Sequence, residues 1–276
     1  MRKAKDKTLK FLMSLCAAVT CLLLIGLIGY MLYRGIPGIN AKFLTTQTSY
    51  ISDSIGILPN ILNTLYLIVL VMIIVVPLGV GAAVYLTEYA SNKRISNAIG
   101  FAVETLTGIP SIIFGLVGML FFTQILGLRQ GILAGSLTLI IMVLPTVISN
   151  TKESLLAVPQ SYREGALALG SGKWHMVRTV VLPNAVDGIV TGCILAVGRV
   201  VGESAALLLT AGFGLKLLGF AEALQSSAAS LTVALYIYAS EEGKFDVAFS
   251  IAVILICVTL IINLAASLVG KKVRKS

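Results

Sequence analysis

The chain contains 276 residues, of which 57% are hydrophobic and 12% are charged, and its mean hydropathy is +0.97. Because a soluble domain is typically about one quarter charged, this composition excludes an ordinary soluble protein and indicates an integral membrane protein. The formal net charge of +9 is concentrated in tails and loops. No basic run is interleaved with aromatic residues, so we expect no nucleic-acid partner.

Six apolar stretches are long enough to cross a bilayer, which takes about 20 helical residues. They are Phe11–Tyr33, Leu58–Leu86, Phe101–Leu126, Ile132–Asn150, Gly188–Ala211 and Val247–Val269. The first follows a basic start, as in a signal peptide, but it is long enough to span and no small-residue cleavage site ends it. We therefore predict an all-α membrane protein with six transmembrane helices, the first of them uncleaved.

The distribution of Lys and Arg predicts the orientation of these helices. If the N-terminus is cytoplasmic, most of the Lys and Arg residues lie on the cytoplasmic side. Five lie on the outer side: Arg34, Lys42, Arg129, Lys216 and Lys244. Inner loops are enriched in Lys and Arg, so we expect both termini in the cytoplasm.

The expected organisation follows from these spans. It comprises a basic cytoplasmic tail (1–10), the first transmembrane helix (11–33), an external loop (34–56), a core of five helices (57–270) and a second basic cytoplasmic tail (271–276). Within the core, the cytoplasmic loop 151–186 and the external loop 212–246 are too long to be simple connections. Ala221–Tyr238 in the latter is expected to form short helices.

The third span is interrupted by Gly108-Ile-Pro-Ser111, which predicts a break or a kink. Glu104 lies near the expected start of this span, where it would stabilise a helix N-terminus. Thr107 and Ser111 carry hydroxyls beside the break. They either satisfy backbone groups or contact a passing anion.

The fifth span contains Arg199 and Glu203, one helical turn apart in the expected helix. An arginine at the bilayer centre costs roughly 2.5–3.5 kcal/mol on insertion scales, so it usually faces protein or a water-filled path. Arg199 could offer a donor fork to an oxyanion while Glu203 orients and partly neutralises it. The pair could equally be an ion pair that joins two helices, and the residues alone leave both readings open.

The cytoplasmic loop is expected to form a helix–turn–helix. Glu164–Leu169 favours a helix, Gly170-Ser-Gly172 can end it, and Lys173–Leu182 can form a second helix that Pro183 stops. Trp174, Val177 and Val181 would share one face of that helix. A helix–turn–helix that projects from the membrane spans in this way is suited to docking into a groove on a cytoplasmic partner.

Gly170-Ser-Gly-Lys173 looks like the end of a phosphate-binding P-loop, but the pattern is incomplete. Leu167 stands where the first glycine is required, and Trp174 stands where Ser or Thr would coordinate magnesium. We therefore expect this chain to bind no ATP, no metal and no other cofactor of its own.

The spacing Glu164-Gly165-Ala166, Gly170, Val180-x-Leu182-Pro183 resembles the EAA loop of ABC-importer permeases, E-A-A-x3-G-x9-I-x-L-P. The departures are Gly165 for alanine and Val180 for isoleucine. This resemblance implies a type I ABC-importer permease fold in which these residues contact a separate ATPase subunit.

Gly198–Gly212, Ile109–Gly115 and Gly79–Tyr89 resemble the PstA-type permeases of phosphate importers, although Ala206 stands where many relatives have proline. The resemblance implies a subunit that moves inorganic phosphate across the cytoplasmic membrane of a prokaryote, with Arg199 in the path. It also implies a PstC-like second permease, two PstB-like ATPases that bind ATP and Mg, and a PstS-like external binding protein.

Three other functions remain open. One is a permease for another oxyanion, such as sulfate or molybdate. Another is a channel or secondary transporter without an ATPase, which leaves the loop Glu164–Pro183 unexplained. A membrane scaffold or sensor is the third, and it would tolerate loss of the Arg199 charge.

Overall fold

The computed structural model describes residues 2–49, 54–90 and 92–275, which are largely helical. The α-helices are α1 (Arg2–Gly35), α2 (Ala41–Thr45), α3 (Leu58–Val84), α4 (Lys93–Thr107), α5 (Ser111–Gly118), α6 (Ile132–Leu156), α7 (Gln160–Ala168), α8 (Lys173–Met176), α9 (Leu182–Gly202), α10 (Ala205–Thr210), α11 (Phe220–Ala223), α12 (Leu231–Tyr236) and α13 (Phe245–Lys275). Shorter turns are the 3-10 helix η1 (Ile36–Gly38) and the π-helices η2 (Tyr85–Tyr89), η3 (Met119–Ile125), η4 (Val177–Val181) and η5 (Ile237–Glu241).

In the described part of the chain, five long apolar helices are able to cross a membrane by length and composition, which confirms most of the expected spans. They cover Asp6–Gly38, Leu58–Tyr89, Ile132–Leu156, Lys173–Gly202 and Phe245–Leu268. The remaining expected span is the pair Arg94–Thr107 and Ser111–Ile125, which is bent by 100°. The bend falls at Gly108–Pro110, where the sequence predicted a break, because proline disfavours a helical residue before it and cannot donate to the ladder.

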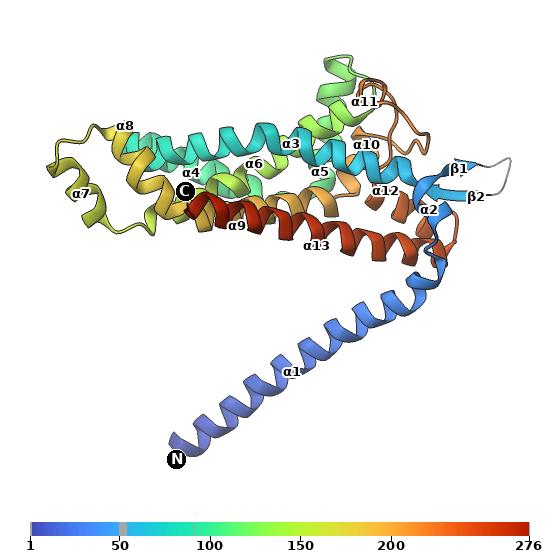
Figure 1. Ribbon diagram of the computed structural model, residues 1–276, viewed down its shortest axis with the longest axis horizontal. Helices are drawn as coiled ribbons and strands as arrows, with labels where there is room; N and C mark the ends of the chain where they lie inside the picture. Colours follow the sequence, from blue (N-terminus) through green and yellow to red (C-terminus); the bar gives the residue numbers. More distant parts are fainter. Residues whose placement is uncertain (1, 50–53, 91, 276) are drawn as a thin grey trace.

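α3, α6, α9 and α13 run side by side as the core of the bundle (Figure 1). The main buried cluster lies between them and includes Leu67, Val71, Met142, Val147 and Val200. Pro77 in α3 and Pro145 in α6 do not interrupt their helices.

The second loop helix does not stop at Pro183, so that expectation is wrong. α8, η4 and α9 form one helix from Lys173 to Gly202. Pro183 lies in the first turn of α9, directly after the π-helix η4. The change of hydrogen-bond register in η4 accommodates the missing N–H of Pro183, so the helix continues through it.

α1 leaves the bundle obliquely and meets it only near its C-terminal end (Figure 1). There Ser250 Oγ donates a hydrogen bond to Gly35 O at 2.9 Å, and Arg34 Nη2 lies 2.8 Å from Asp246 Oδ1. A side chain at Gly35 would clash with the backbone of Phe249. Glycine therefore lets α1 join α13 closely at this end.

Short elements cover this end of the bundle. β1 (Gln47–Ser49) and β2 (Ser54–Ile57) pair antiparallel, and buried Tyr238 lies with its hydroxyl 2.9 Å from Thr48 Oγ1. α11 and α12 confirm the short helices expected within Ala221–Tyr238.

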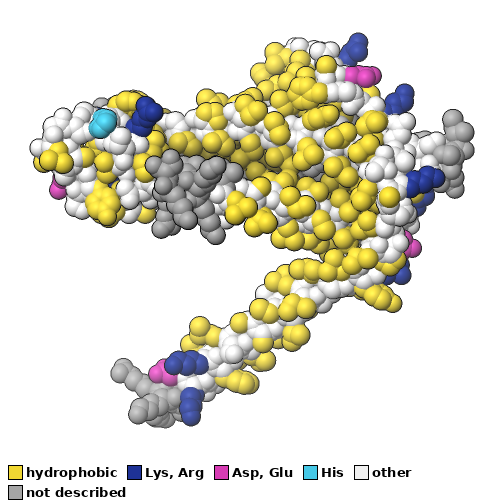
Figure 2. Space-filling model, viewed as in Figure 1, with side chains coloured by type: hydrophobic (Ala, Val, Ile, Leu, Met, Phe, Trp, Pro, Cys, Tyr) yellow, Lys and Arg dark blue, Asp and Glu magenta, His cyan; other side chains and the backbone are white. Residues whose placement is uncertain are grey.

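Hydrophobic side chains cover the middle of the bundle and the length of α1, whereas charged side chains gather at the two ends (Figure 2). α7, α8 and both ends of the described chain lie toward the end of the bundle opposite the β-hairpin (Figure 1). The exposed apolar band is what a lipid-embedded helical protein presents.

Candidate functional site

The fifth apolar span breaks at Glu203, so the continuous helix expected over Gly188–Ala211 is wrong. α9 ends at Gly202, Glu203 has extended backbone angles (φ −81°, ψ 124°), and α10 begins at Ala205. Arg199 occupies the last turn of α9. Arg199 and Glu203 are therefore separated by a helix end rather than joined by a helical turn.

Arg199 is half-buried, and among the described residues its side chain makes one hydrogen bond, from Nη1 to Thr146 Oγ1 of α6 at 3.4 Å. The ion pairs among the described residues are Arg34–Asp246, Arg163–Glu88 and Lys244–Glu242. The expected contact of Glu203 with Arg199 is therefore absent from the described part of the chain. The guanidinium keeps most of its donors for another partner.

Glu203 is buried, with 8% of its surface exposed, and it supports the break itself. Its Oε1 accepts a hydrogen bond from the Ala206 N–H at 3.0 Å, close to the start of α10. Its carbonyl oxygen accepts one from Thr232 Oγ1 at 2.8 Å. A carboxylate at a helix start satisfies a free N–H group, so Glu203 holds α9, α10 and α12 in register.

α9 has one closed face and one open face. Gly188 and Gly192 lie against α6, where a Cβ at Gly192 would stand 2.8 Å from the Asn150 Cβ. Gly198 and Gly202 have no atom within 4 Å of an added Cβ. The small residues thus permit close packing on α6, as expected, while the positions of Gly198 and Gly202 on either side of Arg199 remain uncovered.

The polar residues near the bend of α4 and α5 do not join Arg199 through any hydrogen bond of the described residues. Glu104 lies in the last turns of α4, not at a helix start, so that expectation is wrong. Thr107 Oγ1 donates to the Glu104 carbonyl at 2.6 Å, which confirms a backbone-satisfying role. Ser111 is the first residue of α5.

The loop 151–186 forms the expected helix–turn–helix. In α7, Glu164 and Gly165 are exposed, while Ala166 packs against a buried cluster of residues from α3, α6 and the Lys173–Gly202 helix. Gly170 has φ +82°, a left-handed value that suits glycine and ends α7.

The second part of the loop packs on the same cluster. Val177 and Val181 are buried, and Val180 and Leu182 are half-buried, whereas Pro183 is exposed. Trp174 is 60% exposed. Leu169, directly after α7, is 91% exposed.

One ion pair at this loop is not predicted by the sequence. Arg163 Nη2 lies 2.9 Å from Glu88 Oε1, and the two side chains are 11% and 6% exposed. Glu88 sits at the end of a long apolar span, where a single carboxylate is a signal for a buried partner. Among the described residues, no group of three or more His, Cys, Asp or Glu is placed to hold a metal ion.

Comparisons with known proteins match nearly the whole chain. Residues 75–275 match the family described as "Binding-protein-dependent transport system inner membrane component". The chain is 36% identical to the "Probable ABC transporter permease protein YqgI" of Bacillus subtilis, covering 99% of this chain and 98% of that protein. It is 36% identical to the "Phosphate transport system permease protein PstA 1" of Mycobacterium tuberculosis, over 71% of this chain and 64% of that protein.

Solved structures share the fold. A bacterial alginate ABC transporter in complex with an alginate pentasaccharide-bound periplasmic protein superimposes with a TM-score of 0.70 at 18% identity, covering 100% of this chain and 98% of that one. The MetNI methionine ABC transporter gives a TM-score of 0.62 at 21% identity, over 79% of this chain and 94% of that one.

Proposed function

The chain belongs to the binding-protein-dependent transport system inner membrane component family, and on this premise we propose that it is the PstA-like permease subunit of an importer of inorganic phosphate. Membership makes it a multi-pass membrane permease of the ABC-importer type. The choice of phosphate is supported by relatives named as phosphate permeases in Mycobacterium tuberculosis and Xylella fastidiosa.

The observation that carries the proposal is that Arg199 is half-buried near the end of α9, at the edge of the face packed on α6 and beside the uncovered Gly198 and Gly202. Its guanidinium has a hydroxyl partner and no carboxylate partner among the described residues. An arginine that faced lipid at this position would cost roughly 2.5–3.5 kcal/mol on insertion scales. A water-filled path that admits an oxyanion removes this cost, because guanidinium forks bind tetrahedral oxyanions through paired N–H donors.

A second permease would complete this path. Leu195 is 52% exposed, and Gly198 and Gly202 have open space in front of them. Small residues at a helix surface allow another helix to approach closely. We place a PstC-like subunit against this face, so that Arg199 lies beside the path between the two permeases and Glu203 shapes the path by fixing the end of α9.

Two PstB-like ATPases would supply the energy. ATP and Mg would bind to them, because the Gly170–Lys173 segment of this chain lacks a P-loop. The exposed Glu164, Leu169 and Trp174 would seat in the ATPase, while Gly165, Ala166, Gly170, Val180, Leu182 and Pro183 would give the loop its shape. The loop end and both termini would then be cytoplasmic.

The opposite end of the bundle would receive the external partner. The β1–β2 hairpin and the segment from Gly212 to Asp246 form a surface on which a PstS-like binding protein would dock. ATP binding would close the ATPase pair, displace the loop, and turn the path outward so that phosphate passes toward Arg199. Hydrolysis would reset the path to the cytoplasm.

The test is uptake of labelled phosphate by phosphate-starved cells that depend on this importer, with excess sulfate or molybdate as competitors. Uptake that needs ATP and resists both competitors supports the proposal. Displacement by either competitor reassigns the substrate to another oxyanion. Uptake that persists without the ATPase makes the protein a channel or secondary transporter instead.

A further inference from the structure

α7 is attached to the rest of the protein by little apolar packing. None of its nine residues is buried, and only Arg163 and Ala166 are even half-buried. Tyr162 and Leu167 are 49% and 50% exposed. The helix is flanked by Pro159 and by the turn at Gly170. Its position therefore depends on polar contacts.

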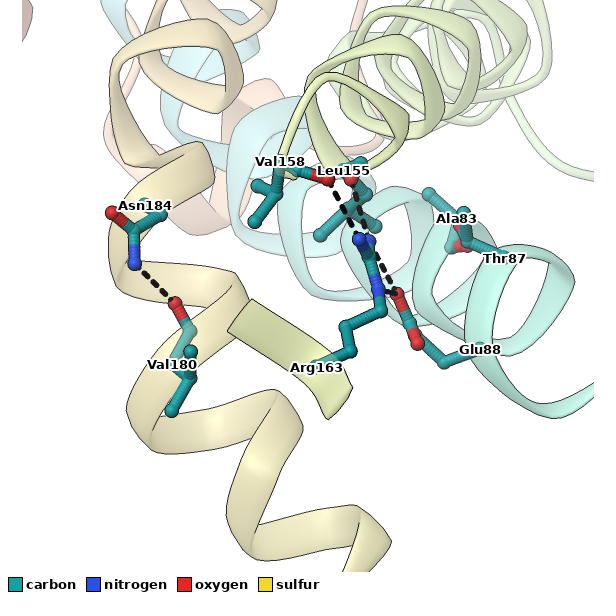
Figure 3. A network of polar contacts seen from close by, with 8 residues as sticks. All are labelled: Ala83, Thr87, Glu88, Leu155, Val158, Arg163, Val180 and Asn184. Atoms are coloured by element: carbon teal, nitrogen blue, oxygen red, sulfur yellow. Dashed lines mark hydrogen bonds and ion pairs between the residues drawn. The ribbon is translucent and has the colours of Figure 1, made fainter. Parts of the chain in front are cut away.

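Arg163 supplies those contacts (Figure 3). Nε and Nη2 donate to Glu88 Oε1 at 3.1 and 2.9 Å, Nη1 donates to the Val158 carbonyl at 2.7 Å, and Nη2 donates to the Leu155 carbonyl at 2.8 Å. Glu88 belongs to η2, which continues α3, while Leu155 lies in the last turn of α6. One side chain thus joins α7 to two membrane helices.

This contact requires several hydrogen-bond donors from one side chain. A planar guanidinium presents five N–H donors in a fixed fork, enough for the four hydrogen bonds to the carboxylate and the two carbonyls, whereas an ammonium group has three donors and no fork. Carbonyls at a helix C-terminus lack intrahelical partners and attract a cation. Because the pair is nearly buried, removing either partner leaves an uncompensated charge.

Tyr89, the residue after Glu88, contacts the other loop helix, α8. Lys173 Nζ lies 5.1 Å from the centre of the Tyr89 ring, within the range of a cation–π contact. α8 also continues directly into α9. Both halves of the loop are therefore fastened to the inner end of α3, α7 through Glu88 and α8 through Tyr89.

We infer that Arg163 is a positioning residue for energy coupling: it makes α7 move as one body with the inner ends of α3 and α6. If Arg163 were absent, force exerted by the ATPase on the loop would bend the connections at Ala157–Pro159 and Gly170–Gly172. The membrane helices would then not move with the loop. The inference rests on the proposed function of the loop as the seat for an ATPase.

The experiment uses the whole complex, with both permeases, the ATPases and the binding protein, in liposomes. The variants are Arg163→Met, Glu88→Gln, Arg163→Lys, and the charge swap Arg163→Glu with Glu88→Arg. Arg94→Met, which removes an exposed arginine from the start of α4, is the matched control. Three quantities are measured: co-purified ATPase, ATP hydrolysis, and phosphate transported per ATP.

Arg163→Met and Glu88→Gln are expected to keep the ATPase bound and hydrolysing while phosphate per ATP falls at least about fivefold, the lower range of typical coupling effects. The charge swap should restore part of the phosphate transported per ATP. Arg163→Lys should give an intermediate value, because it keeps the positive charge but lacks the guanidinium fork. The inference is overturned if all variants keep the wild-type ratio, or if lost ATPase binding accounts for the whole defect.

A second readout does not depend on the cargo. Tyr85, 55% exposed on η2, is replaced by cysteine, and its reaction rate with a water-soluble maleimide is measured with and without trapped ATP. The rate should respond to ATP in the otherwise unchanged complex and not in the Arg163→Met complex; an equal response in both overturns the inference. A complex that moves no phosphate yet responds to ATP refutes only the phosphate assignment.

Discussion

Arg199 and Glu203 belong to separate hydrogen-bond networks, although only three residues stand between them. Arg199 bonds to Thr146 on α6, whereas Glu203 bonds to the backbone of Ala206 and to Thr232. Their functions should therefore be separable: the arginine through its charge, and the glutamate through the shape of the break that it supports.

Replacing Arg199 by glutamine should abolish phosphate uptake while the complex still assembles. The variant keeps hydrogen-bond donors but loses the positive potential that holds an oxyanion. Arg199→Lys should retain partial uptake, since it keeps the charge but not the fork. Uptake of labelled phosphate and co-purification of the partners are the measurements, and Arg94→Gln is the control. Normal uptake by Arg199→Gln would return this residue to a structural role.

Replacing Glu203 separates its charge from its hydrogen bond. Glu203→Gln keeps an oxygen acceptor for the Ala206 N–H and should fold normally with much of the uptake retained. Glu203→Ala should lose about 1 kcal/mol of stability, as for other lost caps. Thermal unfolding of the purified proteins and uptake in cells test this. If the glutamine variant is stable but inactive, the carboxylate charge itself takes part in transport.

Two glycines of α9 should respond oppositely to alanine. Gly192→Ala places a Cβ 2.8 Å from the Asn150 Cβ and should cost about 1–3 kcal/mol through overpacking. Gly198→Ala meets no neighbour and should keep or slightly raise stability. Unfolding midpoints in detergent give the comparison.

A bulkier change at Gly198 tests what faces it. Gly198→Leu should leave the isolated subunit stable but reduce co-purification of the second permease. Equal recovery of the second permease with Gly198→Leu and with the unchanged chain would place the interface elsewhere.

The two loop glycines should also differ. Gly170→Ala forces a Cβ into a left-handed conformation, at a cost of roughly 1–2 kcal/mol, and should loosen the end of α7. Gly165→Ala adds a methyl group with no neighbour within 4 Å and should stabilise α7 by about 0.5–1 kcal/mol. Hydrogen exchange of the α7 amides would report both effects, and equal protection in the two variants would contradict them.

The sequence predicted features that depend on local chemistry. Apolar length located the spans, Gly108–Pro110 located the bend, and Gly170 located the turn. The break at Glu203 was missed because it depends on Thr232, which is 29 residues away, as well as on the local carboxylate. The Arg163–Glu88 pair joins residues 75 apart: the carboxylate at the end of an apolar span signals a partner, but no local pattern identifies Arg163 as that partner.

Pro183 shows a different limit of prediction from the sequence. Proline normally ends a helix, yet a π-turn before it lets the helix continue. Expecting a stop was reasonable from the residue alone, and only the hydrogen-bond register of the preceding five residues decides the outcome.

The unbroken helix from Lys173 to Gly202 fixes an angular phase between the loop and Arg199. At 3.6 residues per turn, one inserted residue would rotate Arg199 by about 100° relative to the loop, whereas four inserted residues would nearly restore its direction. The length of this segment is therefore constrained in whole helical turns, so insertions and deletions should be tolerated periodically along it even where single substitutions are harmless.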